Sequence, residues 1–247
     1  MENEFINTLP PNVARGLTEF VGQARSAFAD DLRAVVLYGS GAEGKLRVTS
    51  DVNLLLVLSA FDQKKADQLR EPLRLAQAAI RLRSMFLLES ELRPAMEAFA
   101  VKFADITRRR RVLYGDDPFA GISIARSDAV VRLKQTLLNL TLRLRESYIA
   151  RGLREEQLVA MIADMAGPLR SCAATLLELE GNPVKTPKEA LHQVAASLPG
   201  GAGRAEEISR ISEARQEGPL APGMAAPTLF HLIELASLMR TRAEALS

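Results

Sequence analysis

The chain has 247 residues, of which 47% are hydrophobic, and its 32 basic and 30 acidic side chains leave a formal net charge of +2. This balance excludes attraction of the whole molecule to nucleic acid or to a membrane, and leaves only a local basic patch open. The single cysteine, Cys172, excludes an internal disulfide and a cysteine-based zinc site, and we expect it to be a small buried helix residue.

Residues 1–12 contain acids and prolines without a long apolar stretch, which argues against a secretory signal. No window of the sequence reaches the roughly 20 apolar residues that a membrane span requires. We therefore expect a soluble cytoplasmic protein with no membrane partner.

The first half of the chain combines helical and strand-like patterns. Apolar residues at helical spacing predict helices, whereas short apolar runs predict strands. We expect helices over residues 13–28 and 64–83, strands over 34–37, 54–58, 85–88 and 100–106, and a brief apolar element over 112–115.

After Gly121 the strand pattern disappears and helical patterns remain. Ser127 is the expected N-cap of a helix whose apolar stripe runs from Val130 to Tyr148. Further helices are expected over residues 155–179, after the capping box that starts at Thr186, and over 229–245. The predicted fold is α/β (α+β), with a small mixed-sheet domain over residues 1–122 and an all-helical bundle over residues 123–247.

The stretch from residue 34 to residue 58 carries the clearest functional pattern. Gly39 to Gly44 fits the G-x-G-x-x-G fingerprint of dinucleotide-binding proteins. That fingerprint requires a crossover helix, and the next strand begins near Val52, which leaves too few residues for one. A glycine-serine turn followed by acids on a strand instead favours nucleotidyl transfer, in which the turn holds phosphates and the acids hold Mg²⁺.

Gly39-Ser40, with Ser50-Asp51 about a dozen residues later, resembles the motif of the nucleotidyltransferase superfamily of the DNA polymerase β type. Residues 99–118 are similar to a segment of its small bacterial members that carry a C-terminal helical domain. The resemblance implies a nucleotidyltransferase-like α/β domain that binds ATP or another nucleoside triphosphate with Mg²⁺ as cofactor. It implies that Asp51 is a metal ligand and that the nucleotide contacts Gly39, Ser40, Lys45 and Ser50.

The sequence departs from this superfamily at two of the three expected carboxylates. Asn53 stands where the second acid is expected, and Lys102 stands where the third is expected on a strand. Asp51, Asn53 and Lys102 are thus the candidate catalytic positions, and their formal charge falls from three negative charges to none. Such a set should hold Mg²⁺ poorly. For Lys102 the alternatives are a direct phosphate contact, an ion pair with Asp51, or a solvated side chain.

The run Arg108 to Arg111 is the densest basic segment. No aromatic residues alternate with it, so stacking of nucleic-acid bases is not expected. We expect a solvated connector here, and no nucleic-acid partner.

Three hypotheses about function follow from the sequence. The first is an impaired or inactive nucleotidyltransferase, a pseudoenzyme, that retains nucleotide binding or acts through a protein partner. The second is an active Mg²⁺-dependent transferase that moves a nucleoside monophosphate to a hydroxyl of a small molecule, protein or nucleic acid. The third is a non-enzymatic interaction module that uses the helical domain. The oligomeric state is left open.

Overall fold

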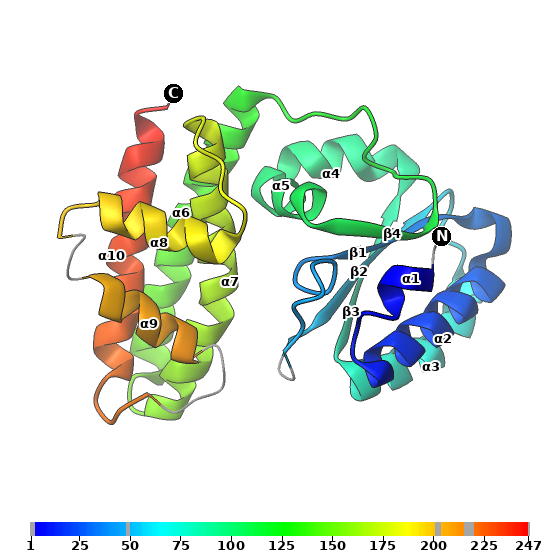
Figure 1. The fold of residues 1–247 in the computed structure, drawn as a ribbon, viewed down its shortest axis with the longest axis horizontal. Coiled ribbons are helices and arrows are strands. Elements are labelled where there is room, and N and C mark those ends of the chain that lie inside the picture. Colours follow the sequence, from blue (N-terminus) through cyan, green and yellow to red (C-terminus); the bar gives the residue numbers. More distant parts are fainter. Residues whose placement is uncertain (1–2, 48–49, 201–203, 215–219, 247) are drawn as a thin grey trace. The chain divides into compact units, whose positions relative to one another are not determined.

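The computed structural model describes residues 3–47, 50–200, 204–214 and 220–246. Its contacts divide the chain into two compact units. The first unit comprises residues 1–96 and 103–123, and the second comprises residues 97–102 and 124–247. Figure 1 shows that the first unit contains the sheet and that the second is helical.

A four-stranded mixed sheet forms the centre of the first unit. Its strands stand in the order β3-β2-β1-β4. β1 pairs antiparallel with both β2 and β4, whereas β2 pairs parallel with β3. The bounds are Leu32–Tyr38 for β1, Val52–Leu58 for β2, Leu82–Leu88 for β3 and Arg110–Gly115 for β4.

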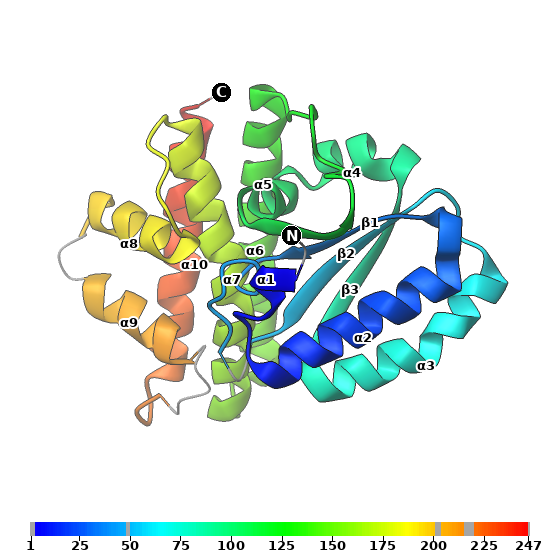
Figure 2. The ribbon, with the colours of Figure 1, turned by 45° about the vertical axis from the view of Figure 1, so that its right-hand side comes forward.

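Helices cover both faces of this sheet. Figures 1 and 2 show α2 and α3 on one face and α4 and α5 on the other. Leu54, Leu56 and Leu58 of β2 pack into the core beneath α2 and α3. Because side chains alternate along a strand, Asn53 belongs to the opposite face. The helices of this unit are α1 (Asn3–Ile6), α2 (Pro11–Phe28), η1 (Ala29–Asp31), α3 (Gln63–Ile80), η2 (Glu89–Glu91) and most of α4 (Leu92–Ala98) and α5 (Ala100–Arg108). The end of α4 and the first turn of α5, residues 97–102, belong to the second unit.

The predicted strand over residues 100–106 is wrong, because this segment is helix α5. Ala100, Phe103 and Ile106 are each 1% exposed, and their spacing of three residues is that of a helix face. A short apolar run does not distinguish a strand from a buried helix by its pattern alone. The correction moves Lys102, one of the candidate catalytic residues, from a strand to a helix.

The second unit is built from helices with apolar inner faces. The predicted stripe on α6 is confirmed, since Leu133, Leu137 and Leu144 are buried. Ser127 is not the N-cap of α6, because the helix begins one residue earlier and its cap position is Ala125. The helices are α6 (Arg126–Arg151), α7 (Glu155–Leu179), α8 (Pro187–Ser197), α9 (Arg204–Ala214) and α10 (Ala225–Glu244).

Two local predictions in the second unit are confirmed. Thr186 caps α8, with its Oγ1 accepting a hydrogen bond of 3.1 Å from the N–H of Glu189. Cys172 is buried in the helical core, and burial raises the pKa of its thiol to about 12. Among the described residues, no helix is both long enough and apolar enough to cross a membrane.

Candidate functional site

The glycine turn follows directly on β1. Gly39 has a φ of 75°, in the left-handed region that favours glycine. The turn is closed by hydrogen bonds from Ala42 N–H to the Gly39 carbonyl (3.1 Å) and from Lys45 N–H to the Ser40 carbonyl (2.9 Å). Within the described residues, the N–H groups of Ser40 and Gly41 donate to no other part of the chain. Gly41 is buried and Ser40 is half-buried, so the Ser40 N–H is the group better placed to donate to a phosphate oxygen.

Strand β4 and the end of α5 support this turn. The Gly39 N–H donates to the Arg109 carbonyl at 2.9 Å. The Arg109 guanidinium donates to Asp105 (Nε to Oδ1, 2.9 Å) and to Glu43 in the turn (Nη1 to Oε2, 3.2 Å). The three side chains are only 15–20% exposed. The prediction of a solvated connector is therefore wrong for Arg109, which lies between α5 and β4 and is bonded to the turn.

Arg110 is also engaged, with the segment that follows β4. Its guanidinium donates to both carboxylate oxygens of Asp117, with Nη2 2.5 Å from Oδ2. Asp117 also accepts the N–H of Phe119 at 3.1 Å. The hydrogen bonds from Arg110 are the main cause that lowers the pKa of Asp117. Asp117 thus has a structural role here.

This ion pair predicts a pH dependence of stability. A carboxyl group whose pKa is lowered by folding stabilises the protein above its unfolded-state pKa, about 3.9 for aspartate. That stabilisation is lost as the pH falls through the lower folded-state value. We expect Asp117→Asn to be less stable than the wild type at neutral pH, with a difference that shrinks as the pH falls below about 4. Urea unfolding across this range, with exposed Asp116→Asn as the control, measures it; a constant difference would contradict the assignment.

Asp51 lies immediately before β2, between two arginines. The carboxylate Oδ1 is 3.4 Å from Nε of Arg81, and Oδ2 is 3.8 Å from Nε of Arg83. The parallel pairing of β2 with β3 sets Asn53 opposite Arg83, so the first residues of both strands lie side by side at one end of the sheet. We call this end, with Asp51, Arg81 and Arg83, the strand edge. The guanidinium groups of Arg81 and Arg83 therefore lie at the position where a metal site would need additional acids.

Sequence reasoning missed Arg81 and Arg83, because the helix was predicted to continue through Arg83 and the strand to begin at Met85. The structure ends α3 at Ile80 and begins β3 at Leu82. A strand-helix-strand unit places its second strand parallel to the first, so their starts are neighbours. That rule, applied with the correct helix end, would have found both residues.

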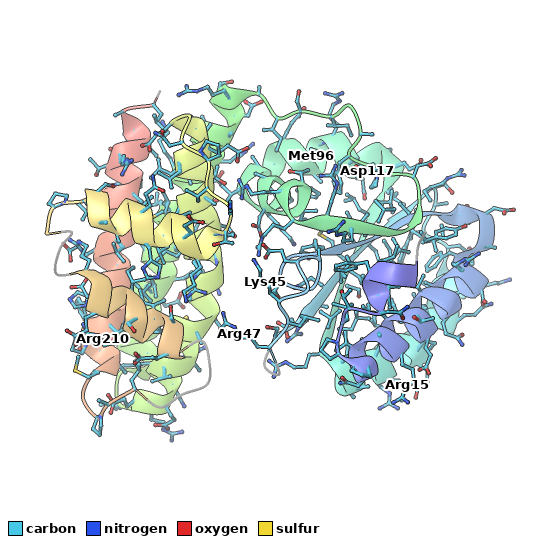
Figure 3. All side chains as sticks on the ribbon, viewed as in Figure 1. Arg15, Lys45, Arg47, Met96, Asp117 and Arg210 are labelled. Carbon is cyan, nitrogen blue, oxygen red and sulfur yellow. The ribbon has the colours of Figure 1, made fainter. Side chains whose placement is uncertain are left out.

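Asn53 and Ser50 make local contacts around Asp51. Asn53 is in register with Tyr38, and its Nδ2 donates to the Asp51 carbonyl at 3.3 Å. Ser50 Oγ accepts the Arg47 N–H at 3.1 Å. Figure 3 shows Lys45 and Arg47 on the segment that leaves the glycine turn. Residues 48–49 of the predicted connector lie outside the described residues.

Lysines 45 and 102 differ in their relation to this site. Lys45 is exposed and its Nζ lies 3.7 Å from Glu43 Oε1, next to the turn. Lys102 belongs to the second unit, whereas Asp51 belongs to the first, so its predicted contact with Asp51 or with phosphate stays a prediction. Partial desolvation lowers the pKa of the Lys102 ammonium, although its side chain retains solvent exposure.

The donor set around Asp51 does not fit the Mg²⁺ ion that the resemblance implies. Mg²⁺ prefers oxygen ligands and usually one or two carboxylates. Here a single carboxylate faces two guanidinium groups, so the cluster is net positive. Across the described part of the chain, no group of three or more His, Cys, Asp or Glu side chains gathers for a metal.

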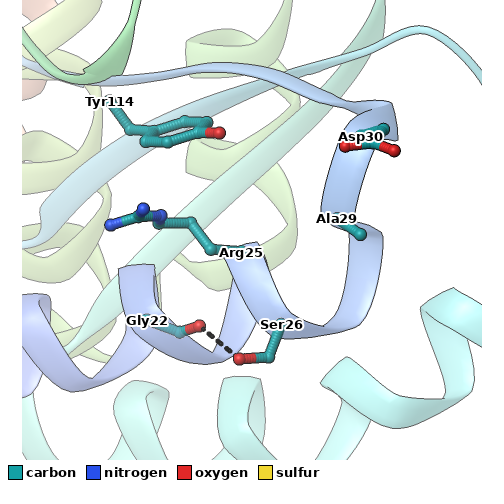
Figure 4. Close-up of a pocket in the computed structure, with 6 residues that line it drawn as sticks. All are labelled: Gly22, Arg25, Ser26, Ala29, Asp30 and Tyr114. Atoms are coloured by element: carbon teal, nitrogen blue, oxygen red, sulfur yellow. Dashed lines mark hydrogen bonds between the residues drawn. The ribbon is translucent and has the colours of Figure 1, made fainter.

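A separate open pocket lies near the other end of β1 (Figure 4). Arg25 stacks over the ring of Tyr114, with its guanidinium carbon 4.7 Å from the ring centroid. Tyr114 is in register with Val35, whereas the glycine turn follows Tyr38 at the far end of the strand. None of the predicted site residues lines this pocket, which is formed by Gly22, Arg25, Ser26, Ala29, Asp30 and Tyr114.

Comparison with known proteins gives a structural relative. No protein-family model matches the chain, and no curated protein matches its sequence. Among solved structures, it is similar to spectinomycin adenyltransferase AAD(9) from Enterococcus faecialis, solved with ATP and spectinomycin. The TM-score is 0.62 at 15% identity, over 90% of this chain and 98% of that one. The chain therefore shares the fold of this adenyltransferase, with a mixed-sheet α/β domain and a helical domain.

Proposed function

We propose that this protein binds a nucleotide on its glycine turn and that its capacity for nucleotidyl transfer is impaired or lost. The observation that carries the proposal is the double ion pair of Asp51 with Arg81 and Arg83. The residue expected to ligate Mg²⁺ is engaged by two positive side chains.

The nucleotide-binding half of the proposal is supported by the turn. Gly39 takes the left-handed conformation, and the N–H groups of Ser40 and Gly41 donate to no other group within the described residues. The turn is braced by Arg109, so it requires little ordering when a ligand arrives. The structural relative was solved with ATP, which makes ATP the first ligand to test.

The proposed loss of nucleotidyl transfer follows from the positive charges beside Asp51 at the strand edge. Phosphoryl transfer by metal-dependent enzymes relies on metal ions to neutralise the developing charge and to orient the attacking oxygen. Asn53 contributes no charge, and Arg81 and Arg83 contribute positive charges that repel a divalent cation. Of the three expected carboxylates that would hold a metal to activate an attacking hydroxyl, only Asp51 is present in the sequence.

The test is a titration of the full chain with ATP, paired with an assay for pyrophosphate release in the presence of Mg²⁺ and hydroxyl acceptors, spectinomycin included. We expect saturable binding and no pyrophosphate above the blank. Ser40→Ala, which removes the Ser40 hydroxyl from the turn and keeps its N–H, should weaken binding several-fold, by roughly the value of one hydrogen bond. Ser26→Ala, an exposed serine on α2 that bonds within its own helix, should not.

Two results would replace this proposal. Tight Mg²⁺-dependent binding with pyrophosphate release would establish the active transferase. The absence of any ATP binding would favour the interaction module that uses the helical domain.

A further inference from the structure

We infer that the strand edge of the first unit binds the triphosphate of a nucleotide in its metal-free form, with the guanidinium groups of Arg81 and Arg83 in the place of Mg²⁺. This inference rests on the proposed nucleotide-binding function. The ligand is then metal-free ATP, Arg81 and Arg83 recognise its phosphates, and Mg²⁺ is expected to weaken binding.

The backbone of Arg81 is fixed by three hydrogen bonds. Its N–H caps α3 by donating to the carbonyls of Ala76 and Gln77, and its carbonyl accepts the Val52 N–H at 3.2 Å. The residue therefore joins the end of α3 to the start of β2. A side chain attached here is held at the strand edge, next to Asp51.

The conformation of Arg81 is unusual for a residue with a side chain. Its φ of 54° and ψ of 40° lie in the left-handed region, where helix ends usually carry glycine. Holding a larger residue in this region costs free energy, and such positions cluster at functional sites. An arginine where glycine would be more stable is consistent with selection for its guanidinium.

Arg83 reaches the same place from the neighbouring strand. It is in register with Asn53, so its side chain emerges on the same face of the sheet as Asn53. The side chains of Arg81 and Arg83 are 51% and 68% exposed, and that of Asp51 is 38% exposed. Both guanidinium groups are thus accessible to a ligand while they are positioned by a carboxylate.

The chemistry of this cluster favours a phosphate without a metal. Guanidinium groups donate paired N–H bonds to phosphate oxygens, which have a spacing similar to that of carboxylate oxygens. A triphosphate can therefore take over the contacts that Asp51 makes. A Mg²⁺ ion on the triphosphate would add a cation beside Arg81 and Arg83 and would cancel part of the charge that attracts them.

The first experiment compares ATP affinity in EDTA and in excess Mg²⁺, at matched ionic strength because salt screens exposed charges. We expect binding to be at least about tenfold tighter in EDTA, and inorganic tripolyphosphate to compete. Equal or tighter binding with Mg²⁺ would overturn this inference and leave nucleotide binding intact. No binding in either condition would overturn both the inference and the proposed function.

The second experiment uses variants of the two arginines. We expect Arg83→Ala and Arg81→Gly each to weaken metal-free ATP binding about tenfold, whereas Arg15→Ala, which removes an exposed charge from α2, should leave it unchanged. Arg81→Gly suits its backbone conformation, so the protein should remain folded. If all three variants lost ATP affinity equally, binding would depend only on the overall charge of the protein, and the assignment of Arg81 and Arg83 would be wrong.

A third variant tests the role of Asp51. Asp51→Asn removes the carboxylate that competes with phosphate for both guanidinium groups, so we expect metal-free ATP to bind several-fold more tightly. An unchanged or reduced affinity in this variant, with folding verified by circular dichroism, would contradict the exchange of carboxylate for phosphate.

Discussion

Gly115→Ala is expected to lower the free energy of unfolding of the first unit by about 3 kcal/mol or more. Gly115 ends β4 at a φ of 74°, and a Cβ atom there would lie 1.9 Å from the carbonyl oxygen of Arg33. That oxygen belongs to the backbone of β1, so no side-chain rotation can relieve the clash. The pairing of β4 with β1 would have to shift.

A matched glycine separates the clash from the backbone conformation. Gly121 has a φ of 72°, but a Cβ atom there meets nothing within 4 Å. Gly121→Ala should therefore cost only the left-handed strain, about 1 kcal/mol. Urea unfolding followed by far-ultraviolet circular dichroism measures both variants. Similar losses of unfolding free energy for Gly115→Ala and Gly121→Ala would mean that β1 and β4 are not as close as the structure has them.

The second large effect is expected from Arg109→Ala. The Arg109 side chain is 16% exposed, and its guanidinium donates to Asp105 and Glu43, whose side chains are 15% and 20% exposed. Removing it leaves two mostly buried carboxylates with only longer contacts to positive groups, from Arg108 to Asp105 at 3.8 Å and from Lys45 to Glu43 at 3.7 Å. We expect the first unit to lose about 2 kcal/mol, less than for a fully buried pair because some water reaches these groups.

Arg111→Ala provides the comparison for Arg109. Arg111 is exposed, donates at 3.4 Å to the Ala42 carbonyl and stacks over Phe5 at 4.8 Å. Arg111 lies on β4, two residues after Arg109, and its replacement removes a positive charge without taking a close partner from a buried carboxylate, so a smaller loss of stability is expected. If urea unfolding shows equal losses of stability for the two variants, the ion pairs of Arg109 with Asp105 and Glu43 do not contribute the expected stabilisation.

The helix and strand patterns around the turn could be predicted because they are local. The predicted strands at 34–37 and 54–58 lie within β1 and β2, and the short spacing after Gly44 correctly excluded a crossover helix. The mixed sheet followed by helices is confirmed as the fold class. These features depend on the period of apolar residues and on glycine positions, which a single sequence displays.

The partners of Asp51 could not be predicted in the same way. They depend on the register of β2 against β3, which is set by the length of α3 and the residue at which it ends. An error of three residues in that end hid Arg81 and Arg83 inside a helix. The prediction of a strand at 100–106 also failed because tertiary packing is not visible in a short segment. Val101 packs in the core of the second unit, whereas Phe103 packs in the first.

The position of β3 at the border of the sheet has a consequence for how the protein behaves at high concentration. An edge strand offers backbone N–H and C=O groups to which the strand of another molecule can add. Most of β3 is apolar, from Met85 to Leu88, and charged residues are a common protection for such edges. Arg83 is the charged residue of this strand, so variants that neutralise it should make pairing with strands of other molecules, and hence aggregation, more favourable. Solubility should constrain which residues this position accepts.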